Sequence, residues 1–194
     1  MNTSKWYDRV PLGSWLLAAC GVVALQALAL YALGRVPICK CGYVKLWHGV
    51  VMSAENSQHI SDWYSFSHII HGFGFYALLW LAARRWPAGM RLAVAVLLEA
   101  VWESIENSSF VIDRYRAITI SLDYYGDSIV NSVSDTLFCA AGFALASRLP
   151  VAATIALTVV MEVGVAYFIR DNLTLNIIML LYPLAAIKAW QAGR

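Results

Sequence analysis

Ionisable side chains recur at helical spacing inside stretches of this sequence that are otherwise long and apolar. Glu99, Glu103 and Glu106 fall within an arc of about 60° on one helix, because a helix advances about 100° per residue. His68 and His71 lie about 60° apart on the preceding apolar stretch. Imidazole and carboxylate groups together are a good ligand set for zinc or another divalent transition metal.

A second polar face follows at the start of the next apolar stretch. Asp127, Asn131 and Asp135 lie within an arc of about 80°. At about 1.5 Å per residue, Asn131, Asp135, His71 and the outer glutamates all lie roughly 5 to 15 Å below one membrane boundary. Ionisable residues at such depth usually face the protein interior or a water-filled cavity. We therefore expect them to meet at one site.

The residues of this site receive the following roles. Metal ligation is predicted for His68, His71 and Asp135, and catalytic roles for Glu103, Glu106 and Asn131. A divalent metal with an open coordination position would give a water that ionises near neutral pH and attacks an ester, amide or phosphoester. The substrate would be a lipid or a lipid-linked molecule. Arg114 and Arg116, in the following loop, are candidates for holding its head group by a two-pronged contact.

The buried polar residues can also have purely structural roles. The two histidines can hydrogen-bond between helices without binding a metal, Glu99 can be a protonated core acid, and Glu162 can pair with an arginine. A non-catalytic assembly or scaffold protein would use its buried acids to hold helices in register. An ion- or proton-coupled transporter would use them as a relay. The apolar inner halves of the predicted spans speak against the relay.

The amino-acid composition indicates where the protein is located. Of 194 residues, 60% are hydrophobic and 13% charged, which is too apolar for a soluble domain and typical of an integral membrane protein. The net charge of +2 comes without a run of lysine and arginine, so nucleic acid is excluded as a partner and membrane lipids are expected. We predict a single integral membrane domain over residues 1–194.

The expected fold is all-α, a polytopic membrane helix bundle of about six transmembrane helices. Its spans are predicted at about residues 12–34, 66–83, 92–112, 128–147, 151–169 and 173–190. Arg84, Arg85 and Arg91 stand in one short connection without acids, which places that connection in the cytoplasm. Both termini then lie in the cytoplasm, and the connection 36–64 lies outside.

The connection 36–64 has its own pattern. Trp47, Trp63 and Tyr64 stand among polar residues, which predicts a short helix along the membrane surface. Cys39 and Cys41 are only two positions apart, so a bond between them would be strained. The sequence favours a partner thiol, a metal or free thiols, and a protein partner that contacts this loop.

Several segments carry a family resemblance over about residues 39–170. They are CKCGYVKLWHG, ENSQHISDWYSFSHIIHGFGFY, WESIENSSFVIDRYR and DYYGDSIVNSVSD. Together they resemble a bacterial inner-membrane family known as a protein of unknown function. The resemblance implies a multi-pass protein of the bacterial inner membrane and supplies no activity.

Two looser likenesses concern the polar residues. The order of a histidine helix, a glutamate helix and then Asp127, Asn131 and Gly142 is similar to VanZ-like membrane proteins. Lipoprotein signal peptidase, an intramembrane aspartyl protease, is somewhat similar in its two asparagine-aspartate boxes. Here these correspond to Asn107 with Asp113-Arg114 and to Asn131 with Asp135, at longer spacings than in that family.

Overall fold

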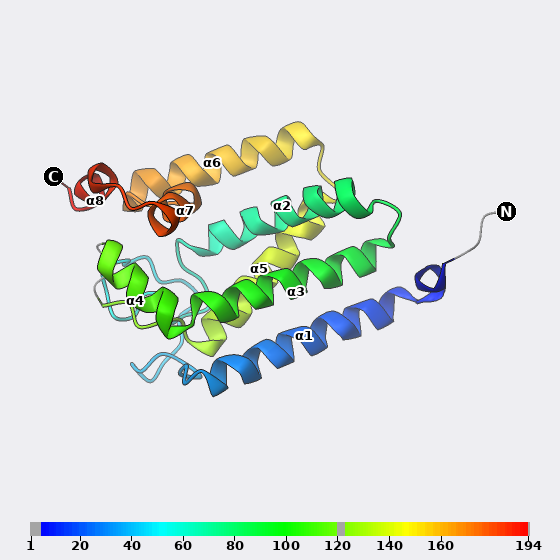
Figure 1. Ribbon diagram of the computed structural model, residues 1–194, viewed down its shortest axis with the longest axis horizontal. Coiled ribbons are helices and arrows are strands. Elements are labelled where there is room, and N and C mark those ends of the chain that lie inside the picture. The colour runs from blue at the N-terminus through cyan, green and yellow to red at the C-terminus, as the bar shows by residue number, and fades with distance from the viewer. Residues whose placement is uncertain (1–4, 120–122, 194) are drawn as a thin grey trace.

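The computed structural model describes residues 5–119 and 123–193, and these form helices joined by loops, without a named strand. A 3-10 turn, η1 (Trp6–Arg9), precedes eight α-helices in the described part of the chain. They are α1 (Leu12–Ala32), α2 (Ser65–Ala83), α3 (Ala88–Glu106), α4 (Ser109–Ile118), α5 (Ile129–Ala146), α6 (Val151–Ile169), α7 (Leu173–Leu181) and α8 (Ala185–Gln191). Figure 1 shows α1, α2, α3 and α6 running along one common direction, with α5 crossing behind α3 at an angle.

Four of the long helices, α1, α2, α5 and α6, are long and apolar enough to cross a membrane. The helix α3 has 19 residues but carries Arg91 and three glutamates. It packs against α1, α2 and α5, so its polar face has partners inside the bundle. The predicted all-α fold is therefore confirmed, with four apolar candidate spans and a charged fifth helix enclosed by three of them.

Two glycines bring α2 and α5 into backbone contact. A Cβ atom on Gly72 would lie 2.1 Å from the carbonyl oxygen of Cys139, and one on Gly142 would lie 2.2 Å from that of Ile69. Small residues allow such close approach between helices. Because His68 stands one turn before Gly72 and Asp135 two turns before Gly142, this crossing brings the two side chains to the same region.

The predicted sixth span does not form one helix. Residues 173–190 divide into α7 and α8, of 9 and 7 residues. At about 1.5 Å per residue both are far shorter than the roughly 30 Å hydrocarbon core of a membrane. Pro183 follows Tyr182, where α7 has ended in an extended conformation, because proline lacks the amide hydrogen that continues a helix.

The predicted third span is also divided. The helix α3 ends at Glu106, and the side chain of Ser108 accepts a hydrogen bond from the Val111 amide to begin α4. With five long helices, η1 and α8 lie at opposite ends of the bundle (Figure 1). This differs from the predicted placement of both termini on one side.

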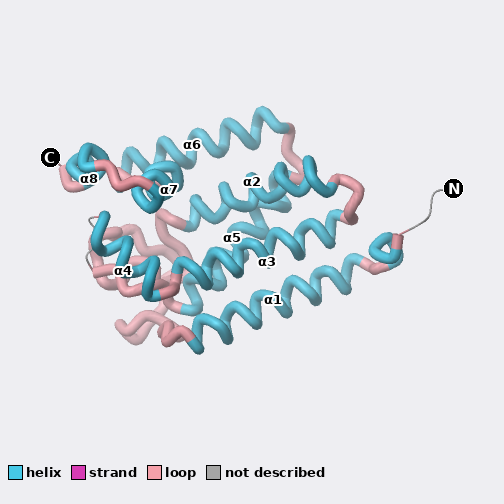
Figure 2. Tube along the Cα trace, in the orientation of Figure 1, coloured by secondary structure: helices cyan, strands magenta, loops and turns pink. Residues whose placement is uncertain are grey.

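The connection 36–64 is fully described and contains no helix, so the predicted surface helix is absent (Figure 2). Its only ladder contact is an isolated bridge between His48 and Asp62. Cys39 and Cys41 form a disulfide with each other, where the sequence favoured other states. Side-chain hydrogen bonds to the backbone hold this loop instead of helical ones.

Glu55 is the centre of that loop. It accepts hydrogen bonds from Lys45 Nζ at 2.6 Å and Tyr43 Oη at 2.9 Å, and lies 3.1 Å from His59 Nε2. His59 Nδ1 accepts from the Lys45 amide, so Nε2 carries the proton that points to Glu55. That tautomer favours a structural role for the His48, Glu55 and His59 group over metal binding.

The pKa of Glu55 is lowered to about 2, chiefly by the hydrogen bond from Lys45 and then by those from His59 and Tyr43. A lowered pKa contributes stability above the unfolded value of about 4.5, and this stability is lost as the pH falls towards 2. We expect hydrogen exchange of residues 43–62 to accelerate through that interval. Glu55→Gln should exchange faster at pH 7 and show no such step; an unchanged step in that variant would contradict the assignment.

Candidate functional site

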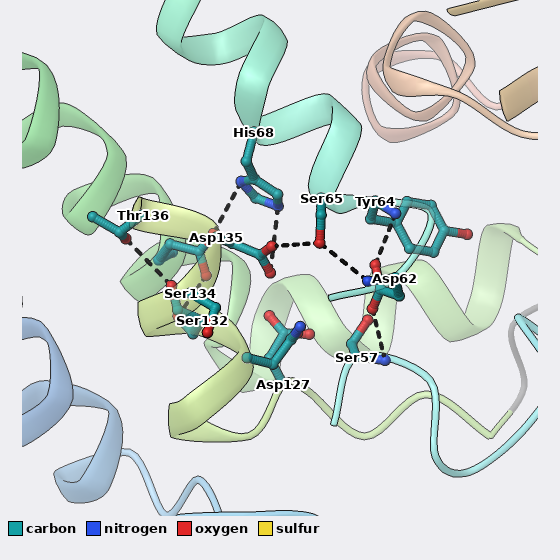
Figure 3. Close-up of polar contacts among 12 residues, drawn as sticks. Ser57, Asp62, Tyr64, Ser65, His68, Asp127, Ser132, Ser134, Asp135 and Thr136 are labelled. Atoms are coloured by element: carbon teal, nitrogen blue, oxygen red, sulfur yellow. Dashed lines mark hydrogen bonds and ion pairs between the residues drawn. The ribbon is translucent and has the colours of Figure 1, made fainter. Parts of the chain in front are cut away.

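His68 stands at the centre of the buried polar cluster. Its Nδ1 lies 2.6 Å from Glu99 Oε1 and 3.2 Å from Glu103 Oε1, while its Nε2 lies 3.8 Å from Asp135 Oδ2. Figure 3 shows the imidazole pointing from α2 towards Asp135 on α5. Since all four side chains are buried, one histidine faces three carboxylates from two other helices in a medium that screens charge weakly.

Glu99 connects the two predicted histidine ligands. His71 Nδ1 lies 3.0 and 3.1 Å from its two carboxylate oxygens, beside the contact with His68. A carboxylate on one ring nitrogen orients a histidine and leaves the other nitrogen for a ligand. Glu99 was not among the site residues predicted from the sequence. The sequence feature that could have indicated it is its position one helical turn before Glu103, on the same face of the helix.

Glu103 is oriented by a chain of hydrogen bonds that begins on α1. Thr136 donates to Gln26 Oε1 at 2.8 Å, Gln26 Nε2 donates to Ser132 Oγ at 3.1 Å, and Ser132 Oγ donates to Glu103 Oε2 at 2.5 Å. The other oxygen, Glu103 Oε1, is buried, and its contact with a donor is the ion pair with His68 Nδ1 at 3.2 Å. Sequence reasoning missed this chain, whose visible sign was a glutamine in the middle of the first apolar stretch.

A second chain runs from the site to the loop, as Figure 3 shows. Ser65 Oγ donates to Asp135 Oδ1 at 3.1 Å and accepts from the Asp62 amide at the same distance. The carboxylate of Asp62 accepts from the amides of Ser57 and Tyr64. Burial outweighs these bonds and raises the pKa of Asp62 to about 6. The loop 36–64 therefore supports the position of Asp135.

A cavity of about 80 Å³ opens beside this cluster. Its polar lining includes His68, His71, Glu106, Asp127, Asn131 and Asp135. Leu173, Ile177 and Leu180 of α7 form an apolar part of the wall. The first part of the broken C-terminal segment thus forms part of the cavity wall.

Of the predicted residues, His68, Glu103 and Asp135 come together, and His71 joins them through Glu99. His68 belongs to two groups of described residues whose ligand atoms lie within 4.8 Å of one another: one with His71 and Glu99, and one with Glu103 and Asp135. Neither of these two groups contains His71 and Asp135 together, so the structure divides the predicted ligand set between them.

The other predicted residues lie around the cluster. Glu106 and Asn131 line the cavity, and Asn131 Nδ2 also donates to the His59 carbonyl at 2.8 Å. Arg114 Nε donates to the Leu180 carbonyl at 2.7 Å near the end of α7, and Arg116 is exposed on α4. Neither arginine lines the cavity. Their predicted contact with a lipid head group stays a prediction.

Glu162 has a different partner from the predicted arginine. Its two carboxylate oxygens accept from the amides of Leu173 and Thr174, both at 3.1 Å. These are the first amides of α7, where a negative charge is stabilised by the helix dipole. Glu162 therefore fixes the start of the helix that covers the cavity.

The fold and the site define an all-helical bundle with four helices able to span a membrane and a buried cluster of histidine, glutamate and aspartate. The chain belongs to the family described as Protein of unknown function (DUF2585), whose model matches residues 30–193. The resemblance to a family of unknown function is thereby confirmed.

Similar proteins carry the family name UPF0314. One from Sinorhizobium fredii (strain NBRC 101917 / NGR234) is 61% identical, covering 92% of this chain and 91% of its own. One from Rhizobium meliloti (strain 1021) is 59% identical with the same coverage, and one from Paracoccus denitrificans (strain Pd 1222) is 58% identical over 89% of each chain. No solved structure matches. These matches do not support the likenesses to VanZ-like proteins or lipoprotein signal peptidase.

Proposed function

We propose that this protein is a multi-pass protein of the bacterial inner membrane that binds a divalent transition metal and catalyses hydrolysis or group transfer on a lipid or lipid-linked substrate. The metal ligands would be His68, Glu103 and Asp135. Compared with the prediction from sequence, Glu103 replaces His71 as the third ligand. A ligand set of one imidazole and two carboxylates suits zinc or manganese.

The buried group of His68, Glu103 and Asp135 carries this proposal. A buried carboxylate is costly, because it has lost its water and must be offset by a positive charge or by donors. Glu103 Oε1 lies 3.2 Å from His68 Nδ1, and one ligand atom from each of the three side chains lies within 4.8 Å of the others. Three carboxylates around one histidine leave an excess of negative charge, which a divalent cation would offset.

The contacts of the two histidines with Glu99 support the same proposal. Glu99 lies within hydrogen-bond distance of Nδ1 of both histidines, and His68 Nε2 lies 3.8 Å from Asp135 Oδ2; both histidines and Asp135 line the cavity. A bound divalent metal would supply Lewis acidity and lower the pKa of its water. Glu106, on the cavity wall, would accept the proton of the attacking water, and Asn131 would hold the substrate by hydrogen bonds.

The membrane orientation follows from the basic turn between α2 and α3. Arg84 and Arg85 lie in that turn, at the end of the bundle opposite to the loop 36–64 and α7 (Figure 1). By the positive-inside rule this end is cytoplasmic, which puts the cavity in the periplasmic leaflet. An apolar cluster around Leu79, Ala95 and Phe143 occupies the other half, and this speaks against a proton path through the bundle.

Metal content of the purified full chain tests the proposal. In a neutral detergent, after dialysis against trace zinc and manganese, we expect about one divalent ion per chain by elemental mass spectrometry. His68→Gln should lose it and His71→Ala should keep it at reduced affinity. A wild-type protein that binds no stoichiometric metal would refute the metal-dependent reaction.

A scaffold without catalysis is the second candidate, and one set of contacts favours it. Asn107 and Asp127 exchange two hydrogen bonds of 2.7 Å, while Gln58 and Ser128 tie the loop 36–64 to the start of α5. These bonds fix the ends of α3 and α5. In a scaffold the Glu103 cluster would serve the same purpose and bind no metal.

A further inference from the structure

We propose that the cavity beside His68 recognises a protonated primary amine on the head group of a lipid. This inference rests on the proposed function for the reaction that follows, but the binding itself needs no metal. Three independent features of the cavity support it: the sign of its charge, an unpaired acceptor and its aromatic walls.

The first feature is charge. Glu106, Asp127, Asp135 and Asp171 line the cavity, whereas none of its described lining residues is lysine or arginine. The two histidines are the lining groups that can carry positive charge, and Glu99 already occupies Nδ1 of both. A phosphate placed inside would meet four acids and no lysine or arginine. Burial raises the pKa of Asp171 to about 6, and a cation placed there would favour the ionised form of these acids and gain Coulomb energy that water does not screen.

The second feature is an unpaired acceptor. Asn56 lines the cavity with 8% of its surface exposed, and its Oδ1 has no hydrogen-bond partner. Its Nδ2 group donates to Ser57 Oγ, so the amide is held and the oxygen is left for a donor. A ligand that fits must donate hydrogen bonds, as an ammonium group does.

The third feature is the aromatic wall. Trp102, Tyr64, Tyr115 and Tyr124 line the cavity, and aromatic rings attract cations. Burial raises the pKa of the three tyrosine hydroxyls well above the usual value, so they stay protonated and neutral. The volume of about 80 Å³ accommodates several non-hydrogen atoms, since about 10–15 Å³ of this kind holds one water molecule.

Apolar residues indicate that the amine arrives on a lipid. Ile177 and Leu180 line the cavity, and both belong to the short helix α7. Carbon chains can lie against these side chains while the head group reaches Glu106 and Asp171. A free amine offers the same charge without the chain, so the experiment must compare the two.

Native mass spectrometry of the full chain in a maltoside detergent with EDTA provides the test. Phosphatidylethanolamine and phosphatidylethanol share every atom except the ammonium group. We expect phosphatidylethanolamine to bind on the order of tenfold more tightly. Equal affinity for the two lipids would overturn the proposal. Free ethanolamine that binds as tightly as phosphatidylethanolamine would overturn the assignment to a lipid.

Two variants with matched chemistry locate the binding. Glu106→Gln should reduce the preference for the amine several-fold, whereas Asp113→Asn, at an exposed acid of α4, should keep it. Trp102→Leu serves as a second cavity variant if Glu106→Gln gives little folded protein. An equal loss in Asp113→Asn would assign the preference to surface charge and overturn the site. Because the measurement is made in EDTA, its result does not depend on whether the protein binds a metal.

Discussion

Gly72→Ala is expected to prevent stable folding of this protein. The new Cβ would lie 2.1 Å from the carbonyl oxygen of Cys139 and 2.6 Å from the amide nitrogen of Phe143, both backbone atoms of α5. Backbone cannot rotate away as a flexible side chain can, so α2 and α5 would have to separate along their contact. Overpacking of this kind costs on the order of 3 kcal/mol or more.

The same helix supplies the control. A Cβ on Gly74 meets nothing within 4 Å, so Gly74→Ala should be tolerated and gain up to about 1 kcal/mol from helix propensity. Thermal unfolding in detergent, with the yield of monodisperse protein from size exclusion, measures both variants. If Gly72→Ala is as stable as Gly74→Ala, the close crossing of α2 and α5 is wrong, and with it the position of His68 against Asp135.

This crossing also separates what the sequence predicts about the site from what it leaves open. Helical phase places Glu99 and Glu103 on one face and His68 and His71 on another, because the period of a helix is a local property. Which oxygen meets which nitrogen depends on how closely α2 and α5 approach. That approach comes from Gly72 and Gly142, whose role is visible only when both helices are in place.

The spans show the same division. The apolar stretches of α1, α2, α5 and α6 were predicted within a few residues, since hydropathy over about 20 residues is enough to identify a helix that can cross a membrane. The stretch 173–190 has similar hydropathy and forms two short helices. Pro183 breaks it, and Glu162 and Arg114 bind the two ends of α7 from other parts of the chain.

The loop 36–64 escaped prediction for a related reason. Its tryptophans and tyrosine fit a surface helix, but its backbone groups are bound by side chains such as Asp62, His59 and Ser65. Partners of this kind stand at irregular spacing and leave no period in the sequence. The same holds for Gln26, which reaches Glu103 only through Ser132 of a third helix.

Glu103→Gln is expected to weaken metal binding strongly while leaving the protein folded. Glutamine has the same shape and keeps a side-chain oxygen that can accept the hydrogen bond from Ser132. It removes the negative charge and one carboxylate ligand, which should weaken metal affinity on the order of a hundredfold or more. With EDTA present, its melting temperature should equal or exceed that of the wild type, because one fewer acid is buried beside Glu99 and Asp135.

Glu162→Gln provides the matched comparison, since Glu162 is also an acid within an apolar helix. It binds the first amides of α7 and lies outside both groups of ligand atoms, so its variant should keep the metal and lose hydrogen-exchange protection in α7. Isothermal titration with zinc and manganese, alongside thermal unfolding in EDTA, measures each variant. A Glu103→Gln protein that binds metal as tightly as the wild type would exclude Glu103 as a ligand. If it also melts at a lower temperature in EDTA, the carboxylate serves the packing of α3 against α5, as the scaffold candidate requires.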